Sequence, residues 1–421
     1  MAQAFSENYE KDVGEFVKMF GQKFRLQYIH FNGGSIASTA FIFNDRIYFG
    51  SDDGYVYCVD LNGKEVWRFK TGDPIADCRT IIENNRLYAA SYDGFWYCLN
   101  PGNGDLLWKF KTGDKNASQA TVFEGIVYLG SWDSYLYAVK EETGKEIWRF
   151  RTGDMIMSAP TIHDGKLMFG SHDGNLYALD PKTGKEIWRF KTNGSIINYN
   201  GTLPVINSII LVPSLDHNLY AVDMNGKEVW RFKTGWGVHG QPEIHNDRIY
   251  MGSMDGNAYC LDLDGKEIWR YKADEGQVSC TRYEFIENKV LFGGQDGNLY
   301  CLDSTKGKLI WKFKTSGALW GGPVIHKGVI YLTSWNCHLY AISVEGQEIW
   351  RFAASNRKPS NEEIIEEVPF VEKPEDLKED DTVLEKDRYI LKKSVEIGDN
   401  VYIKKSQYIL KDQYLDESEY Q

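Results

Sequence analysis

Residues 158–194, SAPTIHDGKLMFGSHDGNLYALDPKTGKEIWRFKTNG, decide the fold because they divide into four short runs separated by turn residues. The runs are 160–162, 166–171, 175–179 and 186–191, and the pairs Asp164-Gly165, Asp173-Gly174 and Thr183-Gly184 lie between them. Such pairs supply the positive φ that tight hairpins require, so this stretch predicts four antiparallel strands. No segment of helical period interrupts them.

The same pattern recurs along the chain, and each copy contains a tryptophan in a near-constant setting at intervals of 39 to 42 residues. The eight members are Trp67, Trp108, Trp148, Trp188, Trp230, Trp269, Trp311 and Trp350. The corresponding units are approximately 33–72, 73–113, 114–153, 154–193, 194–235, 236–274, 275–316 and 317–352. A period near 40 with four strands per unit is typical of propeller blades. We therefore predict an all-β, eight-bladed propeller of four-stranded antiparallel blades, since closing the ring protects the strand edges.

Two segments flank the repeats and divide the chain into residues 1–32, 33–352 and 353–421. Apolar residues at steps of three and four predict a short N-terminal helix over 5–20. Residues 24–31 resemble a degenerate copy of the strand that carries the repeated tryptophan. The sequence therefore leaves open whether this segment or the strand of Trp350 closes the ring. The last 69 residues hold 18 acidic and 11 basic side chains, which predicts an acidic extension with strand-like alternation over 389–415.

The composition of the 421-residue chain is that of a soluble globular protein with a large core: 42% of its residues are hydrophobic, 26% are charged, and its net charge is −12. No window approaches 18 uncharged apolar residues, and the start of the chain has neither a basic nor an apolar signal region. We expect an intact cytoplasmic protein that does not associate with a membrane.

The motif repeated in each unit is more specific than the pattern of turns and strands that propellers in general share. Residues 178–188, ALDPKTGKEIW, recur in variants at 138–148, 221–230 and 301–311. They resemble the pyrroloquinoline-quinone-type (PQQ-like) repeat with its tryptophan-docking motif, and eight copies cover residues 33–352. The resemblance implies that the eight tryptophans pack between neighbouring blades, each burying roughly 150–250 Å².

The same resemblance leaves two functional types to distinguish. Quinoprotein dehydrogenases of the family hold the quinone and a calcium ion over the ring axis, whereas the BamB-like type is a cofactor-free scaffold. This chain lacks the Cys-Cys dipeptide of the dehydrogenases, and it also lacks the signal and lipidated cysteine of BamB. We expect the scaffold type with no cofactor; PQQ and calcium belong only to the oxidoreductase alternative.

The seven cysteines do not form a metal or disulfide pattern. Cys58, Cys98, Cys260 and Cys301 fall in a column that is alanine in the other units, which indicates small buried side chains. Cys78, Cys280 and Cys337 have neither CxxC spacing nor a histidine cluster beside them. Free thiols, a reducing compartment and no metal site are therefore expected.

When the eight units are aligned, one position near the start of each unit always holds a small residue, and the positions directly before and after it vary between units. Because side chains alternate along a strand, these two variable positions share a face, which on the innermost strands points into the axial funnel. We expect a ligand site there. The candidates are Asp77, Arg79, Gln119, Asn200, His239, Gln241, Arg282 and Trp320. The two arginines and the amides would clamp a small anion, and Trp320 would stack on a ring. The favoured alternative is a polar, water-filled channel in which Arg79 pairs with Asp77. No nucleophile accompanies His239, so no residue is assigned a catalytic role.

Basic residues alternate with each repeated tryptophan strand, as Arg189 and Lys191 do after Trp188. They would attract a polyanion, but the favoured interpretation is a solvated, salt-bridged face that prevents edge pairing, and no nucleic-acid partner is expected. The repeated Asp-Gly pairs lack the spacing of calcium loops and are assigned to hairpin turns.

The preferred prediction is a cytoplasmic protein-interaction scaffold without enzymatic activity, whose protein partner the sequence does not name. Two alternatives remain open: a PQQ-dependent oxidoreductase, and a sensor that binds a small anionic ligand in the axial funnel.

Overall fold

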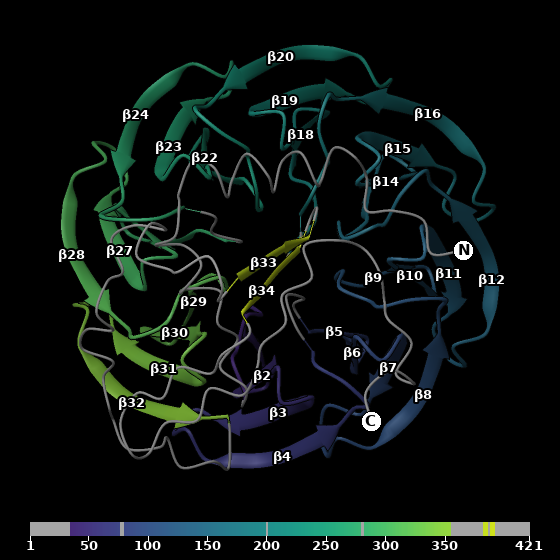
Figure 1. Cartoon of the computed structure of the whole chain (residues 1–421), viewed down its shortest axis with the longest axis horizontal. Coiled ribbons are helices and arrows are strands. Elements are labelled where there is room, and N and C mark those ends of the chain that lie inside the picture. The colour runs from purple at the N-terminus through teal and green to yellow at the C-terminus, as the bar shows by residue number, and fades with distance from the viewer. Residues whose placement is uncertain are drawn as a thin grey trace. The chain divides into compact units, whose positions relative to one another are not determined.

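The computed structural model describes residues 34–75, 80–198, 201–278 and 282–354, together with the backbone of 382–385 and 388–391. The chain divides into two compact units, one of residues 8–356 and one of residues 1–7 with 357–421. In the larger unit, eight four-stranded sheets surround a central axis (Figure 1). This confirms the predicted all-β, eight-bladed propeller. The predicted helix over 5–20 lies outside the described residues, and no helix among those residues is long and apolar enough to cross a membrane.

Each blade takes its four strands, A to D from the axis outward, from consecutive sequence. Blade 1 contains β1 (Phe41–Phe43), β2 (Arg46–Gly50), β3 (Tyr55–Asp60) and β4 (Glu65–Lys70). Blade 2 contains β5 (Ile81–Glu83), β6 (Arg86–Ala90), β7 (Phe95–Leu99) and β8 (Leu106–Lys111). Blade 3 contains β9 (Thr121–Phe123), β10 (Ile126–Gly130), β11 (Tyr135–Lys140) and β12 (Glu146–Arg151). Blade 4 contains β13 (Thr161–His163), β14 (Lys166–Gly170), β15 (Asn175–Leu179) and β16 (Glu186–Lys191).

The second half of the ring repeats this arrangement. Blade 5 contains β17 (Val205–Ile206), β18 (Ile209–Pro213), β19 (Asn218–Asp223) and β20 (Glu228–Lys233). Blade 6 contains β21 (Glu243–His245), β22 (Arg248–Gly252), β23 (Asn257–Asp262) and β24 (Glu267–Lys272). Blade 7 contains β25 (Glu284–Ile286), β26 (Lys289–Gly293), β27 (Asn298–Asp303) and β28 (Leu309–Lys314). Blade 8 contains β29 (Val324–His326), β30 (Val329–Ser334), β31 (His338–Ser343) and β32 (Glu348–Ala353).

The hairpin turns follow from the local sequence. Between strands A and B of blade 4, Asp164 and Gly165 have φ of 48° and 69°, which is the two-residue turn with both central residues left-handed. Between strands B and C, Gly174 has φ of 76° after Asp173. The Asp-Gly pairs therefore occupy the turns that the sequence predicted.

The ring closes between blades 8 and 1 without exchanging a strand. Strand β32, which carries Trp350, pairs with β31 of its own blade. Across the junction, Ile36 N donates to Ser334 O at 3.2 Å and Thr333 Oγ1 donates to Ser38 O at 2.7 Å. Trp350 thus belongs to the strand that completes blade 8, while residues 24–31 lie outside the described residues.

The hydrophobic core lies between blades. For example, Tyr128 and Leu136 of blade 3 pack in one buried cluster with Leu167 and Phe169 of blade 4. A large shared core of this kind makes each blade depend on its two neighbours for burial of its apolar faces.

The eight repeated tryptophans lie on the outermost strands and reach the next blade. Trp67 Nε1 donates to the carbonyl of Pro101 at 3.1 Å, and Gly104 lies so close that an added Cβ would be 2.7 Å from the indole. The same glycine contact recurs for all eight tryptophans. Trp311, against Gly346, differs because its buried Nε1 has no hydrogen-bond partner among the described residues.

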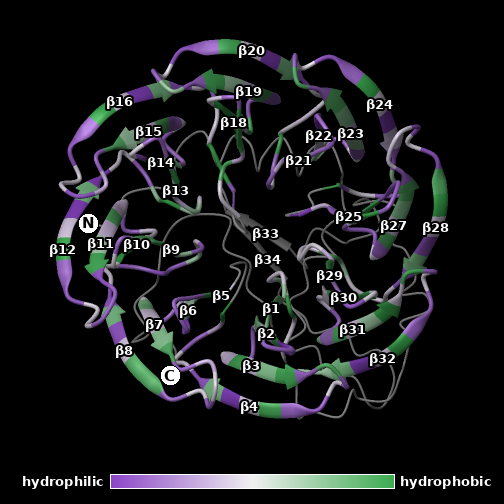
Figure 2. Ribbon diagram, turned by 180° about the vertical axis from the view of Figure 1, so that it is seen from behind, coloured by the Kyte–Doolittle hydropathy of each residue, from purple (hydrophilic) through white to green (hydrophobic). Residues whose placement is uncertain are grey.

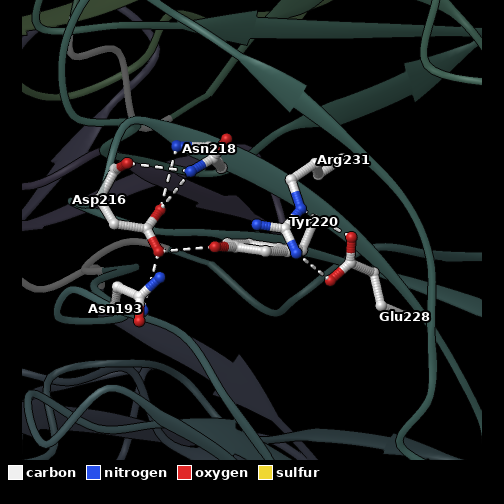
Figure 3. A network of polar contacts seen from close by, with 6 residues as sticks. All are labelled: Asn193, Asp216, Asn218, Tyr220, Glu228 and Arg231. Atoms are coloured by element: carbon white, nitrogen blue, oxygen red, sulfur yellow. Dashed lines mark hydrogen bonds and ion pairs between the residues drawn. The ribbon is translucent and has the colours of Figure 1, made fainter.

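A carboxylate joins successive blades at the opposite ends of the strands (Figure 3). Asp216 Oδ2 of blade 5 accepts the backbone N–H of Asn193, which follows blade 4, at 2.9 Å and the hydroxyl of Tyr220 at 2.7 Å. Asp93 of blade 2 makes the same two contacts, with Gly72 N at 2.8 Å and Tyr97 at 2.6 Å. We call this the Asp–Tyr contact. Three aspartates assigned to turns from the sequence, Asp93, Asp173 and Asp255, therefore also hold neighbouring blades together.

The outer strands carry the salt-bridged face that the sequence analysis favoured. Arg231 lies 2.6 Å from Glu228 on the same strand and stacks over the Tyr220 ring at 4.9 Å (Figure 3). Equivalent glutamate–arginine pairs occur on β4, β12, β16, β24 and β32.

In the smaller unit, β33 (Thr382–Glu385) and β34 (Arg388–Leu391) pair antiparallel, with Thr382 opposite Leu391. The first part of the predicted alternation, at Tyr389 and Leu391, thus falls in a strand. The remainder of 389–415 lies outside the described residues.

Candidate functional site

Five of the eight funnel residues predicted from the sequence lie in the described part of the chain: Gln119, His239, Gln241, Arg282 and Trp320. The other three, Asp77, Arg79 and Asn200, lie outside it, and so does the predicted pairing of Arg79 with Asp77.

The innermost segments of successive blades lie side by side, as the column alignment requires. Ala159 and Thr202, from blades 4 and 5, form a parallel bridge. Gly322 N donates to Thr39 Oγ1 at 2.9 Å across the junction of blades 8 and 1. The column of small residues is crowded, because a Cβ added at Gly201 would overlap the side chain of Gln241.

His239 and Trp320 meet near the axis although they belong to blades 6 and 8. Their ring centroids are 5.7 Å apart at 75°, and Trp320 also stacks on Trp335 at 5.2 Å and 13°. The contact between His239 and Trp320 skips blade 7, which places both rings on the inner side of the ring. Burial lowers the pKa of His239 to about 4, so its imidazole is neutral near pH 7.

Among the remaining candidates, the charge of Arg282 is balanced by a neighbouring carboxylate, and the amide side chain of Gln119 is buried. Arg282 Nε lies 3.0 Å from Glu284 Oε1, so a carboxylate of the same blade already faces its guanidinium. Gln119 is 9% exposed, and its Oε1 has no hydrogen-bond partner among the described residues. Gln241 is half-buried beside Gly201.

A second set of variable residues was missed by the sequence analysis. It occupies the position directly before the aspartate of each Asp–Tyr contact, or before Asn336 in blade 8, in the loop between strands B and C. We call it the B–C loop ring, and it consists of Asp52, Tyr92, Trp132, His172, Leu215, Met254, Gln295 and Trp335. A row of backbone hydrogen bonds fixes it, as in Trp132 N to Lys115 O at 3.0 Å and Trp335 N to Ala318 O at 3.1 Å.

Aromatic groups are concentrated in this ring. The Tyr92 and Trp132 rings are 5.5 Å apart, and Lys115 Nζ lies over both, at 5.1 and 5.6 Å. His172 is fully buried, and burial lowers its pKa to about 3, with a smaller contribution from His239. The sequence feature that marks this ring is the middle residue of the repeated Ser-x-Asp pattern, which changes from unit to unit while the serine and aspartate recur.

The described thiols have the environment of packing residues. Cys58, Cys98, Cys260 and Cys301 are free and fully buried. Burial raises the pKa of the Cys98 thiol to about 12 and that of Cys58 to about 11, which suppresses the nucleophilic thiolate. No group of three metal-ligating side chains occurs among the described residues.

The family profile of the outer membrane protein assembly factor BamB matches residues 52–196, 172–284 and 282–383. The crystal structure of BamB from Moraxella catarrhalis has a TM-score of 0.60 and 20% identity, over 73% of this chain and 92% of that one. The computationally designed Ika8 protein has a TM-score of 0.65 and 16% identity, over 74% of this chain and 98% of its own. No curated protein matches the sequence. Because the profile covers well over half of the residues, the chain belongs to the family of the outer membrane protein assembly factor BamB.

Proposed function

We propose that the protein is a non-enzymatic interaction scaffold that binds a protein partner through its B–C loop ring. The observation that carries the proposal is the half-buried pair of Tyr92 and Trp132 with Lys115 over both rings. Aromatic side chains with a neighbouring cation are the groups that most often dominate the energy of protein interfaces.

The arrangement of constant and variable positions supports this proposal. The tryptophan contact recurs in all eight blades and the Asp–Tyr contact in blades 2 to 6, whereas the B–C loop ring holds different residue types. Loops that vary on a constant frame are where binding residues are usually found.

The proposal includes a cytoplasmic location and no cofactor. The free, buried thiols of Cys58, Cys98, Cys260 and Cys301 support a reducing compartment. The BamB-like family membership supports a scaffold in general terms.

Affinity capture from native lysate with the full chain tests the proposal. The test variant is Tyr92→Ala with Trp132→Ala, and the matched control is Ile187→Ala with Val229→Ala, which removes exposed apolar groups from the outer strands. We expect proteins captured by the wild type to be lost by the first variant and retained by the second. Equal capture by all three proteins would refute binding through the B–C loop ring. A chain ending at Ser355 shows separately whether the C-terminal extension is required.

A further inference from the structure

The outermost strands of the eight blades are sheet edges, and their exposed surfaces are not equivalent. An unpaired edge invites another strand, and charged side chains on it prevent such pairing. Six outer strands begin with a glutamate that pairs with an arginine three residues later, as in Glu228–Arg231 on β20. In each of these strands, one exposed aliphatic residue follows the glutamate, for example Val229 at 54% exposure.

Strands β8 and β28 depart from this pattern at both positions together. Leu106 and Leu309 replace the glutamate, and Lys109 and Lys312 replace the arginine. Each strand therefore presents two adjacent exposed aliphatic residues: Leu106 and Leu107 at 44% each, and Leu309 and Ile310 at 43% and 47%. Figure 2 shows the mixed hydrophobic and hydrophilic bands of the outer strands.

The charge of these two strands also differs from that of the others. Each holds two lysines and no acidic residue, whereas each of the other six contains a glutamate. On β8, Lys109 and Lys111 both lie over the Phe95 ring, at 4.3 and 4.6 Å. On β28, Lys312 forms an ion pair with Asp274, which makes β8 the more cationic surface.

We propose that β8 and β28, the lysine edges, each accept an extended strand of a partner protein that alternates apolar and acidic residues. Leu107, Lys109 and Lys111 alternate with the inward Trp108 and Phe110, so they share the outward face. An alternating strand added to this edge places its acidic side chains on the face of Lys109 and Lys111 and its apolar side chains on the face of Trp108 and Phe110, and its backbone pairs with the free edge. This site is on the circumference and goes beyond the proposed function at the B–C loop ring.

A fluorescein-labelled synthetic peptide of alternating glutamate and valine, blocked at both ends, serves as the probe in fluorescence anisotropy. The test variant of the full chain, Leu106→Glu/Lys109→Arg with Leu309→Glu/Lys312→Arg, restores the pattern of the six other blades, so the sequence itself shows that the fold accepts it. The converse variant, Glu228→Leu/Arg231→Lys, builds a lysine edge on blade 5. A peptide with lysine in place of glutamate and one with a central proline are the controls.

We expect the wild type to bind two glutamate peptides, more weakly as salt is raised. The restored variant should bind about tenfold more weakly or worse, and the converse variant should bind a third peptide. Wild-type affinity in the restored variant, equal binding of the lysine or proline peptide, or no third site would each overturn the proposal. So would a concentration-dependent dimer that disappears in the restored variant without peptide binding, since the occupant would then be a second copy of the chain. The Tyr92→Ala/Trp132→Ala variant should bind the peptide normally, which separates this proposal from the proposed function.

Discussion

Trp350 of blade 8 donates its indole N–H to the carbonyl of Leu61 in blade 1 at 3.1 Å, across 289 positions of the sequence. The first and last blades are thus joined by the contact that also joins blades adjacent in sequence, such as Trp67 with Pro101. The ends of the propeller chain are therefore held by the same interaction as its middle. The junction of blades 7 and 8 departs from it, because the Trp311 Nε1 has no hydrogen-bond partner among the described residues.

Replacing Trp350 with phenylalanine should lower the free energy of unfolding more than the same change at Trp311. Both changes remove similar apolar area, but only Trp350→Phe removes a hydrogen bond and leaves the Leu61 carbonyl without its indole partner. A hydrogen bond of this kind contributes about 1 kcal/mol, so the two variants should differ by about that amount or more. Urea unfolding followed by circular dichroism measures both. Equal losses would show that the indole N–H does not contribute to ring closure.

The Asp–Tyr contact should require a carboxylate in blade 5 but not in blade 8. Asp216 accepts hydrogen bonds from the backbone N–H of Asn193 and from the hydroxyl of Tyr220. In Asp216→Asn these two donors face either the amide NH2 group or a single amide oxygen, so the substitution should lower the free energy of unfolding by about 1–3 kcal/mol. Blade 8 carries Asn336 at this position, which donates to Tyr340 at 2.6 Å and to Ser316 Oγ at 2.9 Å.

Asn336→Asp is the matched control for that substitution, because both of its partners are hydroxyls that are able to donate to a carboxylate. We expect it to change stability by much less than Asp216→Asn in the same urea experiment. A comparable loss at both positions would contradict the idea that the donors around each position determine whether a carboxylate or an amide is required there.

The repeat was sufficient to predict the blades, because turn residues that adopt a positive φ fix where each strand of alternating apolar residues begins and ends. Strand β15, Asn175–Leu179, and strand β16, Glu186–Lys191, begin and end where the sequence placed them. The contact of His239 with Trp320 was not predictable, since it joins blades 6 and 8 and depends on how far the side chains extend toward the axis.

The B–C loop ring escaped the sequence analysis for a related reason. Tyr92 and His172 each lie one residue before the aspartate of an Asp-Gly pair that was assigned only to a turn, and Trp132 precedes Asp133, which belongs to no Asp-Gly pair. A hairpin turn accounts for the backbone conformation at the aspartate, but it does not determine where the preceding side chain lies. Once Asp93 is seen to join two blades, the residue before it is fixed at the junction as well.

Alkaline pH should destabilise the propeller through the tyrosines of the Asp–Tyr contacts. Burial, and then the hydrogen bond to the aspartate, raise the pKa of Tyr220 and of Tyr97 well above the usual value. Below about pH 10 both folded and unfolded states keep the phenol proton, and above it the unfolded state alone loses the proton. The free energy of unfolding should therefore fall as pH rises from about 10 to 11. Tyr220→Phe should reduce that slope by about one proton, and an unchanged slope would refute the assignment.

Mildly acidic pH should destabilise the protein through His172 and His239. Burial lowers their pKa values to about 3 and 4, with His239 adding to the effect on His172, whereas an unfolded histidine titrates near 6.5. As pH falls below about 6.5 the unfolded state takes up protons that the folded state does not bind. The free energy of unfolding should then decrease by up to about 1.4 kcal/mol per pH unit for each histidine. Most carboxylates titrate lower, so urea unfolding between about pH 6.5 and 5 isolates this effect. His172→Gln with His239→Gln should flatten this dependence. A slope that persists in the double variant would place the titrating groups elsewhere in the chain.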